Sequence, residues 1–356
     1  MTASTPLLFQ PIQLRGITLP NRIVIPPMCM YSAEEGFATD FHMAHLGKFA
    51  IGGAGMVILE VTAVSRDGRI THGDLGIWTD EQAKKLAPIA AFLKSEGSVP
   101  AIQIGHSGRK GSMQRPWKGN GPLTPEDIAD GNTPWQPEAP SAVPLADGWL
   151  TPRELDLDDM KRLRGAFADA TKRSVDAGFE SVEIHCAHGY LLQTFLSPLG
   201  NFRKDAYGGD LEGRMRLSLE IAEDVRAALP DNLPLFVRIS SVDAIEGGWE
   251  MEDSLIFAKE LKARGVDVID CSSGGQSPKG ATNFKLVREP GYQVPYAAEI
   301  RREVDIMTQA VGLITDPHHA EAILQAGDAD LIAIGREALY DPFWPRHAAD
   351  AFGLDP

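Results

Sequence analysis

The chain has 356 residues, of which 43% are hydrophobic and 23% are charged, a composition typical of globular proteins. It carries 34 basic and 49 acidic residues, which gives a formal net charge of −15. A surface this acidic repels phosphate backbones and anionic lipids, which argues against nucleic acid or a membrane surface as the main partner. The composition also excludes a fibre, a disordered chain and a small disulfide-stapled protein.

The three cysteines, Cys29, Cys186 and Cys271, lie on separate apolar segments. An odd and sparse set of this kind does not make a disulfide framework, and it is typical of a reducing compartment. The N-terminal segment shows no basic region followed by an apolar one, and no apolar run reaches the ~18 residues that span a bilayer. We therefore expect a soluble, cytoplasmic protein.

Eight short apolar segments are predicted to be strands, because most are rich in Val and Ile and apolar at successive positions, as in strands buried on both faces. In chain order they are residues 22–28, 55–61, 100–106, 181–187, 234–240, 266–272, 307–312 and 331–336. Segments with helical spacing of apolar residues lie between or after them, among them 80–96, 158–177, 214–229, 253–264, 317–326 and 337–352. Glycines follow several of these helices, where a left-handed residue often ends a helix.

Eight strand–helix units predict an α/β protein with a closed (β/α)8 barrel, a TIM barrel, as one domain over residues 1–356. An open doubly wound sheet would use the same units, but the first strand and turn lack the G-x-G-x-x-G sequence of dinucleotide-binding halves. Two segments fall outside the units. Residues 7–19 are expected to form a hairpin at the bottom of the barrel. Residues 107–157, an insert after the third strand, are expected to form a lid over the mouth.

Functional residues of such barrels gather where the strands end, at the C-terminal face. No cluster of carboxylates converges there, which argues against hydrolysis by paired acids. Gly312 and the pair Gly335–Arg336 follow the seventh and eighth strands, where many barrels bind a phosphate through backbone N–H groups. The alternative is that the glycines simply end the strands and Arg336 pairs with an acidic residue. Arg238 ends the fifth strand, and a fixed cation there would stabilise an anionic reduced heteroaromatic ring.

The pair His185-x-x-His188 at the end of the fourth strand has three interpretations. As metal ligands the two imidazoles would need a third partner, and no metal is expected. They would also fit as a hydrogen-bonded pair in the core. As neutral donors they would bind a substrate carbonyl, with Tyr190 as the proton donor. Because tyrosine is a weak acid, it protonates only a strongly basic carbon, which points to reduction at carbon.

Several motifs, taken in chain order, resemble the Old Yellow Enzyme family over about residues 7–350. They are PPMCMY, QIGHSGRK, HCAHGYLLQTFLSPLGNFRKDAYGG, FVRIS, DCSSGG, GLITD and LIAIGREALYDP. More narrowly, the chain resembles the thermophilic-like ene-reductases, which have a cysteine near the flavin, here Cys29. The resemblance implies a TIM barrel with tightly bound, non-covalent FMN that reduces electron-poor alkenes with NADPH or NADH.

The resemblance also assigns roles to residues through the matching motifs. The implied FMN contacts are Pro27, Met28, Cys29, Val61, Gln103, Arg238, Ser273, Gly274, Gly312, Gly335 and Arg336. Cys29 would tune the flavin and would not act as a covalent nucleophile. His185 and His188 would bind the substrate oxygen, while Tyr31 would help to hold the substrate.

The implied reaction is ping-pong. Hydride passes from the nicotinamide through FMN N5 to the β-carbon of an α,β-unsaturated carbonyl compound, and Tyr190 protonates the α-carbon. Quinones and nitro compounds are alternative acceptors for the same flavin. Two hypotheses of other classes are a redox-sensing flavin-binding protein that uses Cys29 and a zinc hydrolase that uses the histidine pair. The resemblance further implies a homodimer or homotetramer, but the family's C-terminal arginine that enters a neighbouring site has no counterpart before Pro356.

Overall fold

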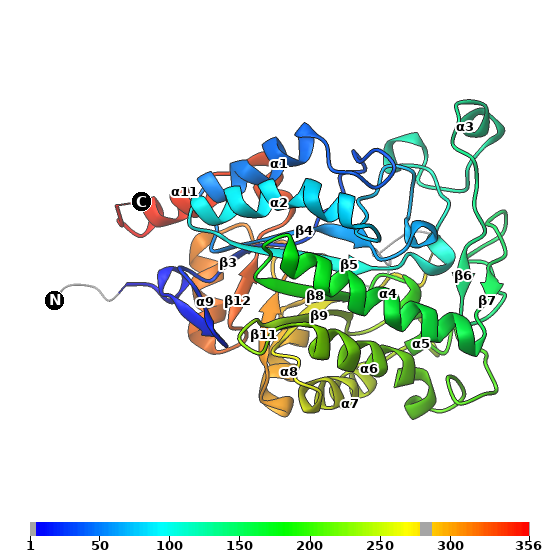
Figure 1. Cartoon of the computed structure of the whole chain (residues 1–356). Helices are drawn as coiled ribbons and strands as arrows, with labels where there is room; N and C mark the ends of the chain where they lie inside the picture. The colour runs from blue at the N-terminus through cyan, green and yellow to red at the C-terminus, as the bar shows by residue number, and fades with distance from the viewer. Residues whose placement is uncertain (1–4, 278–286, 356) are drawn as a thin grey trace.

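The computed structural model describes residues 5–277 and 287–355. Eight parallel strands close into a barrel with helices packed around it (Figure 1). In order around the ring they are β3 (Ile23–Ile25), β4 (Met56–Ala63), β5 (Val99–Gly105), β8 (Ser181–Cys186), β9 (Leu235–Ser240), β10 (Val268–Ser272), β11 (Met307–Ala310) and β12 (Leu331–Ala333). Each strand falls within or largely overlaps a predicted one, and the predicted TIM barrel is confirmed.

Helices follow the strands along the chain. They are α1 (Asp40–Ile51), α2 (Asp80–Ser95), α4 (Leu157–Asp176), α5 (Leu191–Leu196), α6 (Leu211–Ala228), α7 (Met251–Ala263), α8 (Val294–Val304), α9 (Pro317–Ala326), α10 (Arg336–Tyr340) and α11 (Trp344–Ala351). The prediction of one helix over 337–352 is wrong. Asp341 precedes Pro342 and has φ −124° and ψ 86°, because a residue before proline is pushed out of the helical region. The chain therefore turns between α10 and α11.

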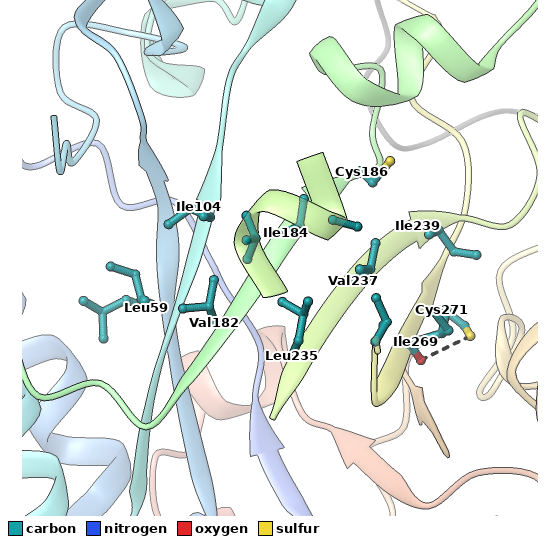
Figure 2. Close-up of a cluster of buried hydrophobic side chains, with 14 of the residues drawn as sticks. Leu59, Ile104, Val182, Ile184, Cys186, Leu235, Val237, Ile239, Ile269 and Cys271 are labelled. Carbon is teal, nitrogen blue, oxygen red and sulfur yellow. Dashed lines mark hydrogen bonds between the residues drawn. The ribbon is translucent and has the colours of Figure 1, made fainter. Parts of the chain in front are cut away.

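The side chains of each strand alternate between the helices and the inside of the barrel. Outward-facing residues such as Val182, Ile184 and Val237 join one large buried cluster with the helices, part of which Figure 2 shows. Cys186 and Cys271 belong to this cluster and are at most 1% exposed, which fits their interpretation as small core residues.

The lower part of the barrel is filled with apolar side chains. Val24, Met56 and Phe236 form a second buried cluster there with Leu14 and Leu19. The two leucines belong to the predicted N-terminal hairpin, which is present as β1 (Ile12–Leu14) paired antiparallel with β2 (Ile17–Leu19). The hairpin thus covers the end of the barrel at which the strands begin.

The insert over residues 107–157 leaves β5 at the opposite end of the barrel from the hairpin (Figure 1). It contains η3 (Gly108–Lys110), η4 (Pro116–Lys118), α3 (Pro125–Ala129), β6 (Glu138–Ala139) and β7 (Arg153–Glu154). Trp135 fastens it to the loop after β4. Its ring lies 5.0 Å from the Arg69 guanidinium, and its Nε1 donates to the Asp67 carbonyl at 3.0 Å. Within the described residues, no helix has the length and apolar character needed to cross a membrane.

Candidate functional site

A cavity of about 620 Å³ opens at the C-terminal ends of β3 and β9–β12. This volume lies within the range of small-molecule sites. Eight of the residues predicted for the site line it: Pro27, Met28, His188, Arg238, Ser273, Gly312, Gly335 and Arg336. The topology of the barrel thus brings together residues that lie up to about 300 positions apart in the sequence.

Arg238, on β9, lines the cavity and is only 7% exposed. Its Nε lies 3.2 Å from Asp270 Oδ2, and it donates no hydrogen bond of good geometry to another described residue. A buried guanidinium with unused donors beside a cavity favours a ligand whose edge carries hydrogen-bond acceptors. The pyrimidine edge of FMN, with N1 and O2, has this chemistry.

Arginines and glycines also line the cavity, the glycines at the loops after β11 and β12. Gly312 has φ +135°, and a Cβ there would come within 3.2 Å of the Gln293 amide nitrogen, so the position favours glycine. Among the described residues that line this cavity, Arg288 and Arg336 occur with a single carboxylate, Glu337, although the chain as a whole is acidic. No carboxylate lies within ion-pair distance of Arg336 in the part of the chain that the structure describes. Such a lining favours a phosphate, and together with the unused donors of Arg238 it fits FMN.

Four predicted FMN contacts do not line this cavity. Gln103 lies deeper in the barrel, where its Nε2 donates to Glu183 Oε1 at 2.8 Å. Gly274 is held by a 2.8 Å bond from its amide to the Val242 carbonyl. Cys29 and Val61 lie in the neighbouring cluster described next.

A second pocket lies under the insert. Val61, Ile70 and Met113 form a buried apolar cluster, and four half-buried side chains pack against it: Cys29, Tyr31, Trp149 and Tyr190. His185 and Tyr190 line a small pocket with Val61 and Ile70. The predicted catalytic residues therefore come together. Ile70 and Met113 also belong to this site, and the sequence did not predict them because both lie on irregular loops without a motif.

The two histidines lie between these pockets as neutral rings. The centroids of His185 and His188 are 5.1 Å apart, and the ring planes are nearly perpendicular. Burial lowers the pKa of each well below its usual value. His185 Nδ1 accepts from the Ala187 amide at 3.3 Å, so its proton is assigned to Nε2, which becomes a donor. His188 Nε2 shares a 2.8 Å hydrogen bond with Ser272 Oγ.

The metal interpretation of the histidine pair lacks a third ligand. Among residues 5–277 and 287–355, no group of three His, Cys, Asp or Glu side chains is arranged to hold a metal ion. The geometry instead favours the interpretation of the two imidazoles as neutral hydrogen-bond donors.

Lys110 joins the loop after β8, which carries His188 and Tyr190, to the loop after β10. Its buried Nζ donates to the His188 carbonyl at 2.7 Å and to the Gly275 carbonyl at 2.5 Å. It also lies 5.6 Å from the centroid of the Tyr190 ring. The loops touch at Gly189, where an added Cβ would lie 2.1 Å from the Gly275 oxygen, so neither loop tolerates a side chain there. Burial lowers the pKa of Lys110 to about 7.

A buried acidic group, Glu60, holds the turn that carries Cys29 and Tyr31. The Met30 amide donates to Glu60 Oε2 at 2.8 Å, and Glu60 is only 4% exposed. Burial is the main cause that raises the pKa of the Cys29 thiol well above its usual value. Cys29 therefore stays a thiol, which fits a residue that contacts a ligand better than a nucleophile.

Glu60 also predicts how stability depends on pH. Burial raises its pKa to about 8, whereas an unfolded glutamate titrates near about 4.3. Between these values the folded state holds more protons than the unfolded state, so the free energy of unfolding decreases as pH rises. We expect Glu60→Gln to lose less thermal stability than the wild type between about pH 5 and about pH 8, as measured by melting temperature. Parallel curves for the two proteins would contradict a neutral Glu60.

Comparisons with known proteins agree with this geometry. The model of the NADH:flavin oxidoreductase / NADH oxidase family matches residues 7–354. The chain is 45% identical over 344 residues to NADPH dehydrogenase of Bacillus subtilis (strain 168), covering 96% of this chain and 94% of the relative. It is 43% identical over 349 residues to NADPH dehydrogenase of Geobacillus sp. (strain WCH70), covering 98% and 95%. The solved old yellow enzyme homologue from Zymomonas mobilis is similar with a TM-score of 0.79 and 27% identity, covering 98% of this chain and 94% of that one.

Proposed function

Because the chain belongs to the NADH:flavin oxidoreductase / NADH oxidase family, we propose that it is an ene-reductase acting on α,β-unsaturated carbonyl compounds. Family membership makes it an oxidoreductase that uses FMN, with NADH or NADPH as the reductant. The resemblance to the Old Yellow Enzyme family is confirmed at the level of the family. The narrower assignment to the thermophilic-like subclass stays a prediction.

The residues that line the large cavity would hold FMN. Arg238 would donate to the N1 and O2 edge of the ring, while Arg336 and the backbone at Gly312 and Gly335 would hold the phosphate. When bound, FMN accepts hydride from the reduced nicotinamide and passes hydride to the acceptor. Cys29, Val61 and Gln103 are proposed to contact the ring from the side of the second pocket and the barrel interior.

The substrate would bind beside the two histidines. A neutral His185 offers Nε2–H to the carbonyl oxygen, and His188 lies beside it at the mouth of the cavity. These donors stabilise the negative charge that develops on the oxygen as hydride arrives at the β-carbon. Burial raises the pKa of Tyr190 well above its usual value, so it holds its proton until a strongly basic carbon takes it.

One observation carries the proposal: neutral His185, neutral His188 and Tyr190 converge next to the cavity that contains Arg238. The ring centroids of His185 and Tyr190 are 5.0 Å apart. Quinones or nitro compounds would use the same cavity without needing a proton donor to carbon, so the position of Tyr190 favours alkenes. A homodimer or homotetramer stays a prediction.

The visible spectrum of the purified protein tests this proposal. We expect a yellow FMN spectrum that bleaches on addition of NADPH without oxygen and returns when cyclohexenone is added. If the spectrum returns with a quinone but not with the enone, the proposed alkene substrate is wrong and quinones or nitro compounds are the acceptors. A yellow protein that NADPH bleaches but that no acceptor restores would support the redox-sensing hypothesis, and a colourless hydrolase inhibited by a chelator would support the zinc hypothesis.

A further inference from the structure

Five polar side chains from neighbouring strands form a layer inside the barrel, above the apolar side chains at its lower end. They are Gln103 of β5, Glu183 of β8, Arg238 of β9, Asp270 of β10 and Gln309 of β11. The strand register places Gln103 beside Glu183 and Asp270 beside both Arg238 and Gln309. All five are at most 7% exposed. Only Arg238 reaches the wall of the large cavity.

The layer contains two carboxyl groups but one cation. Arg238 Nε lies 3.2 Å from Asp270 Oδ2 and compensates the charge of Asp270. A second buried carboxylate would have no cation, and burying an uncompensated charge costs several kcal/mol. The arrangement with the lower free energy is therefore one in which Glu183, which is 1% exposed, carries a proton.

The hydrogen bonds around Glu183 and Asp270 also indicate that one of the two carboxyl groups is protonated. Glu183 Oε1 accepts from Gln103 Nε2 at 2.8 Å. Glu183 Oε2 and both oxygens of Asp270 lack an N–H or O–H donor of good geometry within the described residues. A proton on Glu183 Oε2 would supply that missing donor. Burial, and then the charge of Asp270, raises the pKa of Glu183 well above its usual value.

We propose that Glu183 is a positioning residue: as a neutral carboxylic acid that donates to Asp270, it leaves a single negative charge beside Arg238 and thereby sets the reduction potential of the bound flavin. The proposal rests on the proposed function, in which Arg238 contacts FMN. Reduction adds negative charge to the flavin next to Arg238. An ionised Glu183 would place a second negative charge behind that guanidinium and disfavour reduction.

Two substitutions that preserve size distinguish a neutral Glu183 from an ionised one. In Glu183→Gln the amide still accepts from Gln103 and donates N–H to Asp270, so it imitates the neutral acid. We expect its flavin midpoint potential to match that of the wild type. In Asp270→Asn a negative charge beside Arg238 is lost, so we expect the ratio of reduced to oxidised flavin at a fixed potential to increase about tenfold, equal to ~30 mV for a two-electron couple.

The potentials are measured on the holoprotein by reduction with dithionite against a reference dye. If Glu183→Gln raises the potential as much as Asp270→Asn does, Glu183 is ionised and the inference is wrong. Infrared difference spectra between wild type and variant give a second readout that does not depend on the potential: besides the C=O band of protonated Glu60, which Glu60→Gln removes, the wild type should show a second protonated-carboxyl band that Glu183→Gln loses. A wild type without that band would also overturn the inference. A protein that binds no FMN would instead contradict the proposed function.

Discussion

Replacing Tyr190 with phenylalanine is expected to slow alkene reduction by about 10²- to 10⁴-fold, the usual contribution of a general acid. Reduction of FMN by NADPH should proceed at nearly the wild-type rate, because that half-reaction needs no proton on carbon. The substitution removes one hydroxyl and keeps the ring, which lies 5.0 Å from His185 and packs on the cluster around Val61. Rapid-mixing experiments that follow the flavin absorbance separate the two half-reactions.

Tyr207→Phe is the matched control for this experiment. The Tyr207 hydroxyl donates to Glu220 at 3.1 Å, outside both pockets, so its loss should leave both half-reactions unchanged. Equal losses in the two half-reactions of Tyr190→Phe would mean that Tyr190 supports FMN or its surroundings rather than protonation. The assignment of the proton donor would then be wrong.

The barrel was predictable because the outward-facing positions of its strands are occupied by apolar residues. Residues such as Val182, Ile184 and Val237 must be apolar to pack under the helices, and they make the strands stand out as short apolar runs. The break between α10 and α11 was missed because the apolar spacing continues past Pro342, although the backbone cannot stay helical at Asp341. Here a local steric rule outweighed the periodic pattern.

The candidate site was predictable only where it lies at strand ends. His185 and Arg238 are neighbours in the register of β8 and β9, so the topology alone brings them together. Ile70 and Met113 lie on loops and Lys110 ends the short η3, and long-range contacts place these segments. Trp135 packing on Arg69 and Lys110 bonding to the Gly275 carbonyl are examples, and neither contact leaves a local pattern in the sequence.

The layer around Glu183 and Asp270 shows a related limit. Each of these carboxyl groups occupies an inward-facing position of its strand. The alternation of apolar and polar residues along a strand fits equally well with a half-buried strand whose polar side chains are exposed to solvent. Only closure of the barrel makes both groups buried, at 1% and 0% exposure, and puts them beside Arg238. Their charge state therefore follows from the fold and not from the sequence pattern.

The substitution Arg336→Met is expected to weaken FMN binding by about 10- to 150-fold, because a hydrogen bond to a charged group contributes about 1.5–3 kcal/mol. Arg336 lines the cavity next to Gly335, and no described carboxylate neutralises it, so its charge is available to a phosphate. Methionine keeps an unbranched apolar stem and removes the guanidinium with its charge and N–H donors. Titration of the apoprotein with FMN, followed by the loss of flavin fluorescence, measures the dissociation constant.

Riboflavin, which has the same ring but no phosphate, separates binding of the ring from binding of the phosphate. Arg336→Met should bind riboflavin as the wild type does, because the contacts proposed for Arg238 with the ring remain. Arg346→Met, which removes an exposed guanidinium that bonds the Ile51 carbonyl at 3.1 Å, should change neither affinity. An equal loss of FMN and riboflavin binding in Arg336→Met would place Arg336 at the ring or in the fold, and the phosphate would then have to lie elsewhere in the cavity.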